Sequence, residues 1–293
     1  MRILLISIVV FCNTIIGFAQ MIDLDKGRTT KIEIVNIHGD LKIEGVNANR
    51  ILIERIKYNP VPESIREPLE DQGYKKSDLD DLSIQNVGNK LIISPANIKG
   101  QFADYQLKVP KDMIISIKTD VKILYKKEWN IGNVFSLVHN NININSVDGE
   151  IEISTYTSII LLQDIKGPIT CDLYEGEISA IFLDNIPAKK STLSIFEGKV
   201  NVYLPEKVSC FVDLNIGSDV EECEDYGACK INSDFDIQNA SLKSSEYTSN
   251  ITKGDAINKK AAIITGIKGQ INDGGSCEFT ISAYFGEINL LKK

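Results

Sequence analysis

A glycine corner followed by an apolar–polar–apolar triplet recurs five times in this 293-residue chain. Glycine adopts positive φ without strain, so it can form a corner that most other residues would resist. A charged residue follows each glycine and marks the solvent side, and the triplet after it is typical of a strand with one buried face. The repeat therefore predicts stacked or meandering turn-then-strand units. The corners fall at Gly39, Gly149, Gly176, Gly198 and Gly286.

The spacing of the corners favours one architecture among β-folds. Gly167 lies in a sixth, weaker copy of the corner motif. Gly149 and Gly167 are 18 residues apart, and Gly176 and Gly198 are 22 residues apart. About 20 residues are enough for one rung of a β-solenoid, although an open roll or sandwich would show similar spacing. Because the units share one pattern, we predict an all-β, repeat-built, solenoid-like stack (β-helix or roll) of short strands. The copies at 38–43 and 285–290 are expected in its terminal coils.

Alternation of apolar and polar residues predicts strands along most of the chain, and no stretch predicts a long amphipathic helix.

Two segments depart from this alternating pattern. Residues 59–81 hold several prolines, and we expect an excursion from one sheet edge there. Residues 219–260 form a polar stretch with weak alternation. The predicted half-buried strands include Ile32–Ile34, Leu41–Ile43, Ile51–Ile53, Leu91–Ile93, Ile115–Ile117, Val121–Tyr125, Ile142–Ile144, Ile159–Leu161, Leu193–Ile195 and Val200–Leu204.

Residues 1–19 have the features of a secretory signal. Arg2 precedes the nearly unbroken apolar run Ile3–Phe11, and Gly17 and Ala19 are the small residues that a signal peptidase recognises. Phe11 is too bulky beside Cys12 for lipid attachment. We therefore predict a signal peptide at 1–19, a single β-repeat domain at 20–293 without a membrane span, and export to the periplasm or the cell surface.

Five cysteines follow the predicted signal, and we expect two of them to pair. Cys223 and Cys229 flank a short acidic loop, and an oxidising compartment favours a local disulfide between them. No Cys-x-x-Cys pattern or nearby histidine points to a metal there. Cys171, Cys210 and Cys277 occupy the apolar parity of predicted strands, where cysteine behaves as a small buried hydrophobe.

The sequence has none of the common signatures of catalysis or of nucleic-acid binding. The formal charge of −8 opposes binding to phosphate backbones. There is no nucleophile elbow, phosphate-binding loop or dinucleotide fingerprint. The two histidines, His38 and His139, lie at a corner and at a strand end, which argues against a histidine triad or a multi-histidine metal site. We predict no catalytic, cofactor-binding or metal-binding residues.

Carboxylates are the plentiful reactive groups, and they support one alternative. β-Solenoids often act on acidic polysaccharides, and paired acids serve glycosidases, so the alternative is a polysaccharide lyase or hydrolase. Each acid also occupies a repeat position where a solvated charge is expected, whereas an active site should break a repeat. Acidic clusters at 78–81 and 219–225 do not match EF-hand spacing, so calcium is not predicted. The acids to test first are Glu150, Glu152, Glu175 and Glu177.

Three short motifs stand out beside the corners: Leu107–Lys111, Val202–Pro205 and the ending Gly269–Leu290, in which a turn, a strand and a glycine corner follow one another. They resemble motifs of the bacterial putative-adhesin family of β-strand-repeat domains, and the ending is the most specific of the three. The corner has Phe285 and Glu287 where asparagine is usual in the family. The resemblance implies a repetitive, solenoid-like β-fold at the cell envelope, and it carries over no catalytic residues.

The repeats, the predicted signal and the missing catalytic signatures predict a non-catalytic envelope scaffold or surface-interaction (adhesin-like) protein. Its partner is expected to be an envelope protein or a glycan, because a stack of coils presents long flat faces to extended ligands. A third hypothesis is a structural subunit that associates through its end strands, with Lys292 and Lys293 limiting edge pairing.

Overall fold

The computed structural model describes residues 19–24, 29–58, 82–95, 101–119, 139–182, 186–217, 229–244 and 264–293. Within these ranges the chain forms eighteen strands of one sheet and no helix, which confirms the predicted all-β class. In chain order the strands are β1 (Ala19–Asp23), β2 (Lys31–Val35), β3 (Ile37–His38), β4 (Leu41–Val46), β5 (Arg50–Tyr58), β6 (Leu82–Val87), β7 (Lys90–Pro95), β8 (Gln101–Pro110), β9 (Ile114–Lys118), β10 (His139–Asn145), β11 (Ile151–Gln163), β12 (Ile169–Ile181), β13 (Ser191–Leu204), β14 (Cys210–Ile216), β15 (Lys230–Ser233), β16 (Ile237–Ser244), β17 (Ile264–Ile271) and β18 (Cys277–Lys292).

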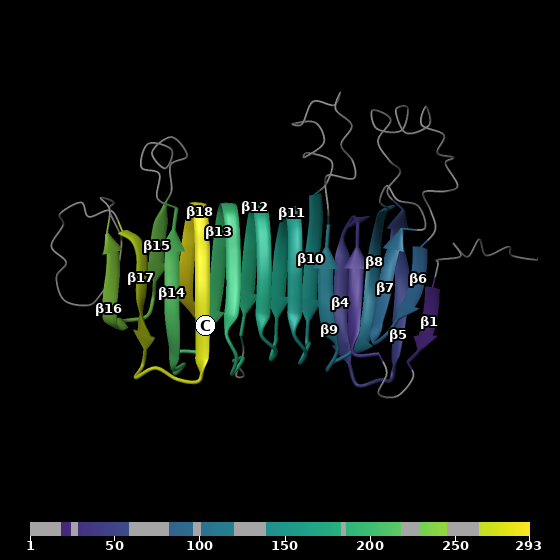
Figure 1. The fold of residues 1–293 in the computed structure, drawn as a ribbon, viewed down its shortest axis with the longest axis horizontal. Coiled ribbons are helices and arrows are strands. Elements are labelled where there is room, and N and C mark those ends of the chain that lie inside the picture. Colours follow the sequence, from purple (N-terminus) through teal and green to yellow (C-terminus); the bar gives the residue numbers. More distant parts are fainter. Residues whose placement is uncertain are drawn as a thin grey trace, which may run out of the picture.

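Figure 1 shows these strands side by side in one long row, with β16 at one end and β1 at the other. Four long strands in this row, β11, β12, β13 and β18, pair in parallel and repeat one shape. Each has a corner near its middle, and the corner residues are paired in register from strand to strand. The corners of neighbouring strands therefore lie at the same level. The aligned corner residues are Ser158, Gly176, Gly198 and Gly286.

The corner divides each long strand into two parts, which we call its first and second arms. The residues that are buried change from odd to even positions, or the reverse, at the corner. In β13, Leu193 and Ile195 are buried before the corner, and Val200 and Val202 are buried after it. This change keeps the apolar side chains of both arms on the inner side of the strand. Phe182, directly after the second arm of β12, packs edge to face on the ring of a residue in the first arm of β18, with ring centroids 5.4 Å apart. The two arms therefore face each other across a shared core, which forms one cluster of buried residues.

Three strands occupy places in the row that their order in the sequence does not suggest. β18 pairs with β13 on one side and with β14 and β15 on the other, and Figure 1 shows this yellow strand between green neighbours. Likewise, β2 lies between β7 and β9, and β4 lies between β8 and β10. The expectation that the copies at 38–43 and 285–290 lie in terminal coils is therefore wrong, because both fill interior places.

Antiparallel strands occupy both ends of the row. At one end β5 pairs with β8, β1 pairs with β5, and β6 pairs with β7. At the other end β17 pairs with β14, and β16 pairs with β17. Parallel stacking in register thus holds for the middle of the row. The solenoid-like stack as a description of the whole domain stays a prediction.

The five predicted corner glycines differ in backbone conformation. Gly39, Gly176, Gly198 and Gly286 have positive φ, whereas Gly149 does not. At Gly149 the constraint is a close approach, because a Cβ there would lie 2.1 Å from the carbonyl oxygen of a neighbouring turn. Of the five, Gly149 therefore depends on the absence of a side chain rather than on φ.

Other predictions on strands have mixed outcomes. The strand at Ile159–Leu161 exists with its faces reversed, since Ile159 is 48% exposed while Ile160 and Leu162 are buried. Within the polar stretch 219–260, the structure places β15 and β16. The predicted excursion at 59–81, the strand Val121–Tyr125 and residues 1–18 of the predicted signal lie outside the described residues.

Candidate functional site

A row of stacked aromatic rings crosses four neighbouring strands. Tyr156, Tyr174, Phe196 and Tyr284 come from β11, β12, β13 and β18, and each stands two residues before the aligned corner. Successive ring centroids are 4.2, 4.7 and 5.0 Å apart, with interplanar angles of 18°, 12° and 8°. The rings stack because parallel strands in register repeat the same position about every 4.8 Å. We call these four residues the aromatic row.

The aromatic row lies on the outer face of its strands. Tyr174 and Tyr284 are each 39% exposed, although aromatic side chains usually bury most of their surface. The ring of Phe285 packs edge to face on Phe196 and Tyr284, with centroids 5.3 and 4.6 Å away, and so supports the row. Sequence analysis missed these residues. The signal was an aromatic residue two positions before each of four aligned corners, and it becomes visible once the corners are aligned.

A second row, of small polar side chains, runs parallel to the aromatic row. It stands two residues nearer the start of each strand and therefore on the same outer face. The strand register pairs its members one to the next, across β11, β12, β13, β18 and β14. We call this set the polar row. Its members are Ser154, Asp172, Ser194, Ser282 and Asn215.

The two rows border a cavity of about 390 Å³, and Asp172 is the one charged side chain among the residues that line it. Next to Tyr284 lies Gly217, the residue that follows β14, and its amide donates to the carbonyl oxygen of Ala283 at 2.8 Å. Gly217 brings no side chain to the aromatic row, which therefore stops at Tyr284 among the described residues. The polar and aromatic side chains that line the cavity are Asp172, Ser194, Phe196, Asn215, Ser282 and Tyr284.

The side chains of this arrangement can make both polar and apolar contacts with a ligand. Hydroxyl, amide and carboxylate groups in the polar row can donate and accept hydrogen bonds, and the aromatic row offers apolar contact area. The cavity lining described here holds no histidine, lysine or cysteine to activate the serine hydroxyls. His38 and His139 belong to β3 and β10, which contribute no residue to that lining.

Two of the four acids proposed for catalysis, Glu152 and Glu177, accept hydrogen bonds from side chains of other strands. Glu152 lies on the first arm of β11, and its carboxylate accepts a hydrogen bond from Lys31 at 2.5 Å. This hydrogen bond lowers the pKa of Glu152. A general acid in a glycosidase needs a raised pKa, so Glu152 does not fit that role.

The remaining three acids lie near the corners and turns. Glu177, on the second arm of β12, accepts hydrogen bonds from Asn201 at 2.8 Å and from Ser179 at 3.0 Å. Glu175 pairs in register with a like charge on β13, and Glu150 lies in the turn before β11. None of the four acids lines the cavity beside the aromatic row.

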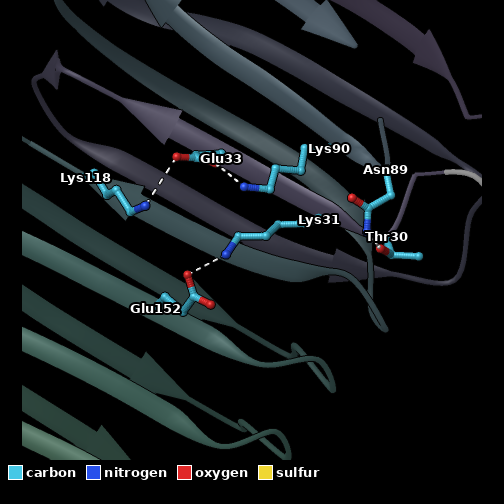
Figure 2. Close-up of polar contacts among 7 residues, drawn as sticks. All are labelled: Thr30, Lys31, Glu33, Asn89, Lys90, Lys118 and Glu152. Carbon is cyan, nitrogen blue, oxygen red and sulfur yellow. Dashed lines mark hydrogen bonds and ion pairs between the residues drawn. The ribbon is translucent and has the colours of Figure 1, made fainter. Parts of the chain in front are cut away.

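A network of ion pairs lies where β2 passes between β7 and β9 (Figure 2). Glu33 of β2 accepts hydrogen bonds from Lys90 and Lys118, each at 3.3 Å, and so joins β2 to both neighbours. Burial alone would raise the pKa of Glu33, but the hydrogen bonds and charges of the two lysines outweigh it and lower that pKa. Because these charges pair between neighbouring strands, we assign the network to the register of β2 rather than to a ligand.

Neither a metal site nor a membrane helix is found in the described ranges. Those ranges hold no group of three or more histidine, cysteine, aspartate or glutamate side chains placed to bind a metal ion. They also hold no helix with the length and apolarity needed to cross a bilayer. Cys223 and the acidic clusters at 78–81 and 219–225 lie outside them, so the predicted disulfide between Cys223 and Cys229 stays a prediction.

Solved structures that resemble this chain include two distant neighbours. The sequence matches no protein-family model and no curated protein. A "putative cell adhesion protein" from Clostridium sporogenes aligns over 94% of this chain and 100% of its own, with 12% identity and a TM-score of 0.42. A "putative adhesin" from Bacteroides fragilis aligns over 94% of this chain and 97% of its own, with 11% identity and a TM-score of 0.30. Values this low assign neither a family nor a function to the chain.

Proposed function

We propose that this protein is a non-catalytic, adhesin-like protein of the cell envelope that binds a glycan chain along the aromatic row. The observation that carries the proposal is the pairing of two rows, one aromatic and one polar, along a cavity on the outer face. Sugar rings combine apolar C–H faces with hydroxyl groups, and a site for them needs apolar contact area beside groups that make hydrogen bonds.

The aromatic row supplies the apolar part of this site. Its rings stack face to face and Tyr174 and Tyr284 are partly exposed, so we expect their edges and hydroxyl groups to meet the ligand. The polar row supplies hydrogen bonds along the same line. Because both rows cross several strands, they suit a ligand with repeating units better than a compact molecule.

The site is also preorganised. The members of both rows stand on strands that are hydrogen-bonded to neighbours, and their rings are held by contacts with one another. A site that is rigid before binding loses less conformational entropy when the ligand arrives. We infer that the solenoid-like stack serves as a rigid support for a long, shallow site.

The envelope location rests on the predicted signal at 1–19, and the absence of catalysis rests on the chemistry of the cavity. The acids of the enzyme alternative do not line the cavity, and the pKa of Glu152 is lowered rather than raised. A polysaccharide lyase or hydrolase is therefore the second candidate, and the first experiment separates the two.

That experiment screens the protein against a glycan array and analyses the ligand that is recovered from every hit. We expect a saturable hit from which the glycan is recovered intact. Recovery of shortened glycans would overturn the non-catalytic proposal. A complete absence of hits, with a hit in a parallel capture of envelope proteins, would replace the glycan by a protein partner.

A further inference from the structure

Two thiols lie opposite each other where β18 enters the row between β13 and β14. Cys210 is the first residue of β14, Cys277 is the first residue of β18, and the parallel register pairs them directly. Both are buried, with exposures of 0% and 5%. Directly paired residues on neighbouring strands point to the same face, here the inner one. The thiols of Cys210 and Cys277 therefore share one small space in the core.

This pairing meets the geometric requirement for a disulfide. Neighbouring strands are about 4.8 Å apart, which is inside the range of about 4.4–6.8 Å that Cα atoms of a disulfide span. The two Cβ atoms leave their strands side by side rather than in opposite directions. Cys171 offers a contrast, because the register places it between Ile153 and Leu193 and gives it no thiol partner.

Hydrogen bonds also distinguish the two thiols. The Cys277 thiol donates to the carbonyl oxygen of Ser209 at 3.1 Å, and the Cys277 sulfur accepts from the Cys210 thiol. A hydrogen bond from the Cys210 thiol to the Cys277 sulfur lowers the pKa of Cys277, and the same bond together with burial raises the pKa of Cys210. The thiolate is the form that attacks a disulfide. Cys277, which is the more exposed of the two and follows an exposed turn, is therefore the attacking group.

We propose that Cys210 and Cys277 form a disulfide that crosslinks β14 to β18. The oxidant is a small-molecule or protein disulfide. The Cys277 thiolate attacks one sulfur of this oxidant, forms a mixed disulfide and releases the first oxidant thiol. Cys210 then loses its proton, attacks the Cys277 sulfur and displaces the second oxidant thiol. Two electrons pass to the oxidant, and the two protons of the cysteines end on its thiols.

The crosslink goes beyond the proposed binding function and has a consequence for the cavity. Asn215 on β14 and Ser282 and Tyr284 on β18 line the cavity beside the aromatic row. A covalent bond at the start of both strands fixes their relative register, so it fixes the relative positions of these three side chains.

Peptide mapping of the protein tests the proposal without any substitution. The protein is equilibrated with oxidised glutathione, denatured, alkylated and digested with trypsin and a protease specific for acidic residues, which cleaves between Cys210 and Cys223. We expect a peptide that links Cys210 to Cys277, two mass units lighter than the sum of its reduced parts, and alkylation of Cys171. Full alkylation of both Cys210 and Cys277 would overturn the proposal, as would a link from Cys277 to any other cysteine.

A melting experiment gives an independent result. Because Cys223 and Cys229 are also predicted to pair, it uses the Cys223→Ala/Cys229→Ala variant as its background. We expect reduction to lower the melting temperature by roughly 5 °C or more, since a crosslink between distant residues restricts the unfolded chain. Adding Cys171→Ala should preserve this difference, and adding Cys277→Ala should abolish it. Equal melting temperatures before and after reduction would contradict the proposal.

Discussion

The side-chain amide of Asn289 donates a hydrogen bond to the Oδ1 atom of Asn201 at 2.8 Å, although 88 residues separate the two in the sequence. Asn232 donates to Asn289 at 2.7 Å, and Asn201 donates to Glu177 at 2.8 Å, so one polar ladder crosses β15, β18, β13 and β12. This ladder joins β18 to the strands on both sides of it. We assign the ladder to the register of β18, as we assign the lysine–glutamate network to the register of β2.

The ladder predicts a measurable loss of stability in Asn289→Ala. The substitution removes one hydrogen bond to each neighbouring strand at a half-buried position, and each contributes about 1 kcal/mol. We expect the free energy of unfolding in urea to fall by about 1–2 kcal/mol. Asn86→Ala, at an exposed position on β6, is the matched control and should change it by less than about 0.5 kcal/mol. Equal effects of the two substitutions would show that the ladder does not hold β18.

The corner at Gly198 predicts a larger effect. Gly198 has φ of 132°, and a Cβ there would lie 2.0 Å from the carbonyl oxygen of Gly176. Gly198→Ala must therefore displace the backbone of β12, and we expect it to cost about 3 kcal/mol or more. Gly88 also has positive φ, but no atom lies within 4 Å of the place that a Cβ would take there, so Gly88→Ala should cost about 1 kcal/mol. Thermal unfolding of the two variants would contradict this account if their order were reversed.

The ion pairs of β2 predict a loss of stability in acid. The pKa of Glu33 is lowered from 4.5 in the folded protein, so the unfolded chain takes up the proton first as the pH falls. The stability contributed by Glu33 is present above pH 4.5 and is lost as the pH drops through the lower folded value. We expect Glu33→Gln to be less stable than the wild type at pH 7 and to show a weaker decline between about pH 5 and pH 3. Parallel pH profiles of the two proteins would contradict the role of Glu33.

The sequence predicted which face of a strand is buried better than it predicted which strands pair with one another. Buried parity was predictable where apolar and polar residues alternate strictly, as in Leu193–Ile195 and Val200–Leu204. It was not predictable in the run from Ile159 to Leu162, because four consecutive apolar residues fit either face and the corner at Ser158 decides between them.

The place of β18 could not be derived from the order of the repeats. The ending 285–290 has the same corner pattern as the copy at 197–202, and that pattern fits any neighbour in the stack equally well. Its actual place depends on contacts with β13, β14 and β15, which are distant in sequence. The last member of the aromatic row was missed for the same reason, since Tyr284 stacks on Phe196 only when β18 lies next to β13.

The aromatic row predicts that loss of its two exposed tyrosines weakens binding without unfolding the protein. The measurement is a calorimetric titration of the glycan selected on the array, with the wild type, the Tyr174→Ala/Tyr284→Ala variant and Phe211→Ala. Phe211 is the matched control, because it is 47% exposed on β14 and does not line the cavity. We predict that the double variant binds at least about tenfold more weakly, whereas Phe211→Ala binds like the wild type. Unchanged affinity in a folded double variant, or an equal loss in Phe211→Ala, would contradict a binding site along the aromatic row.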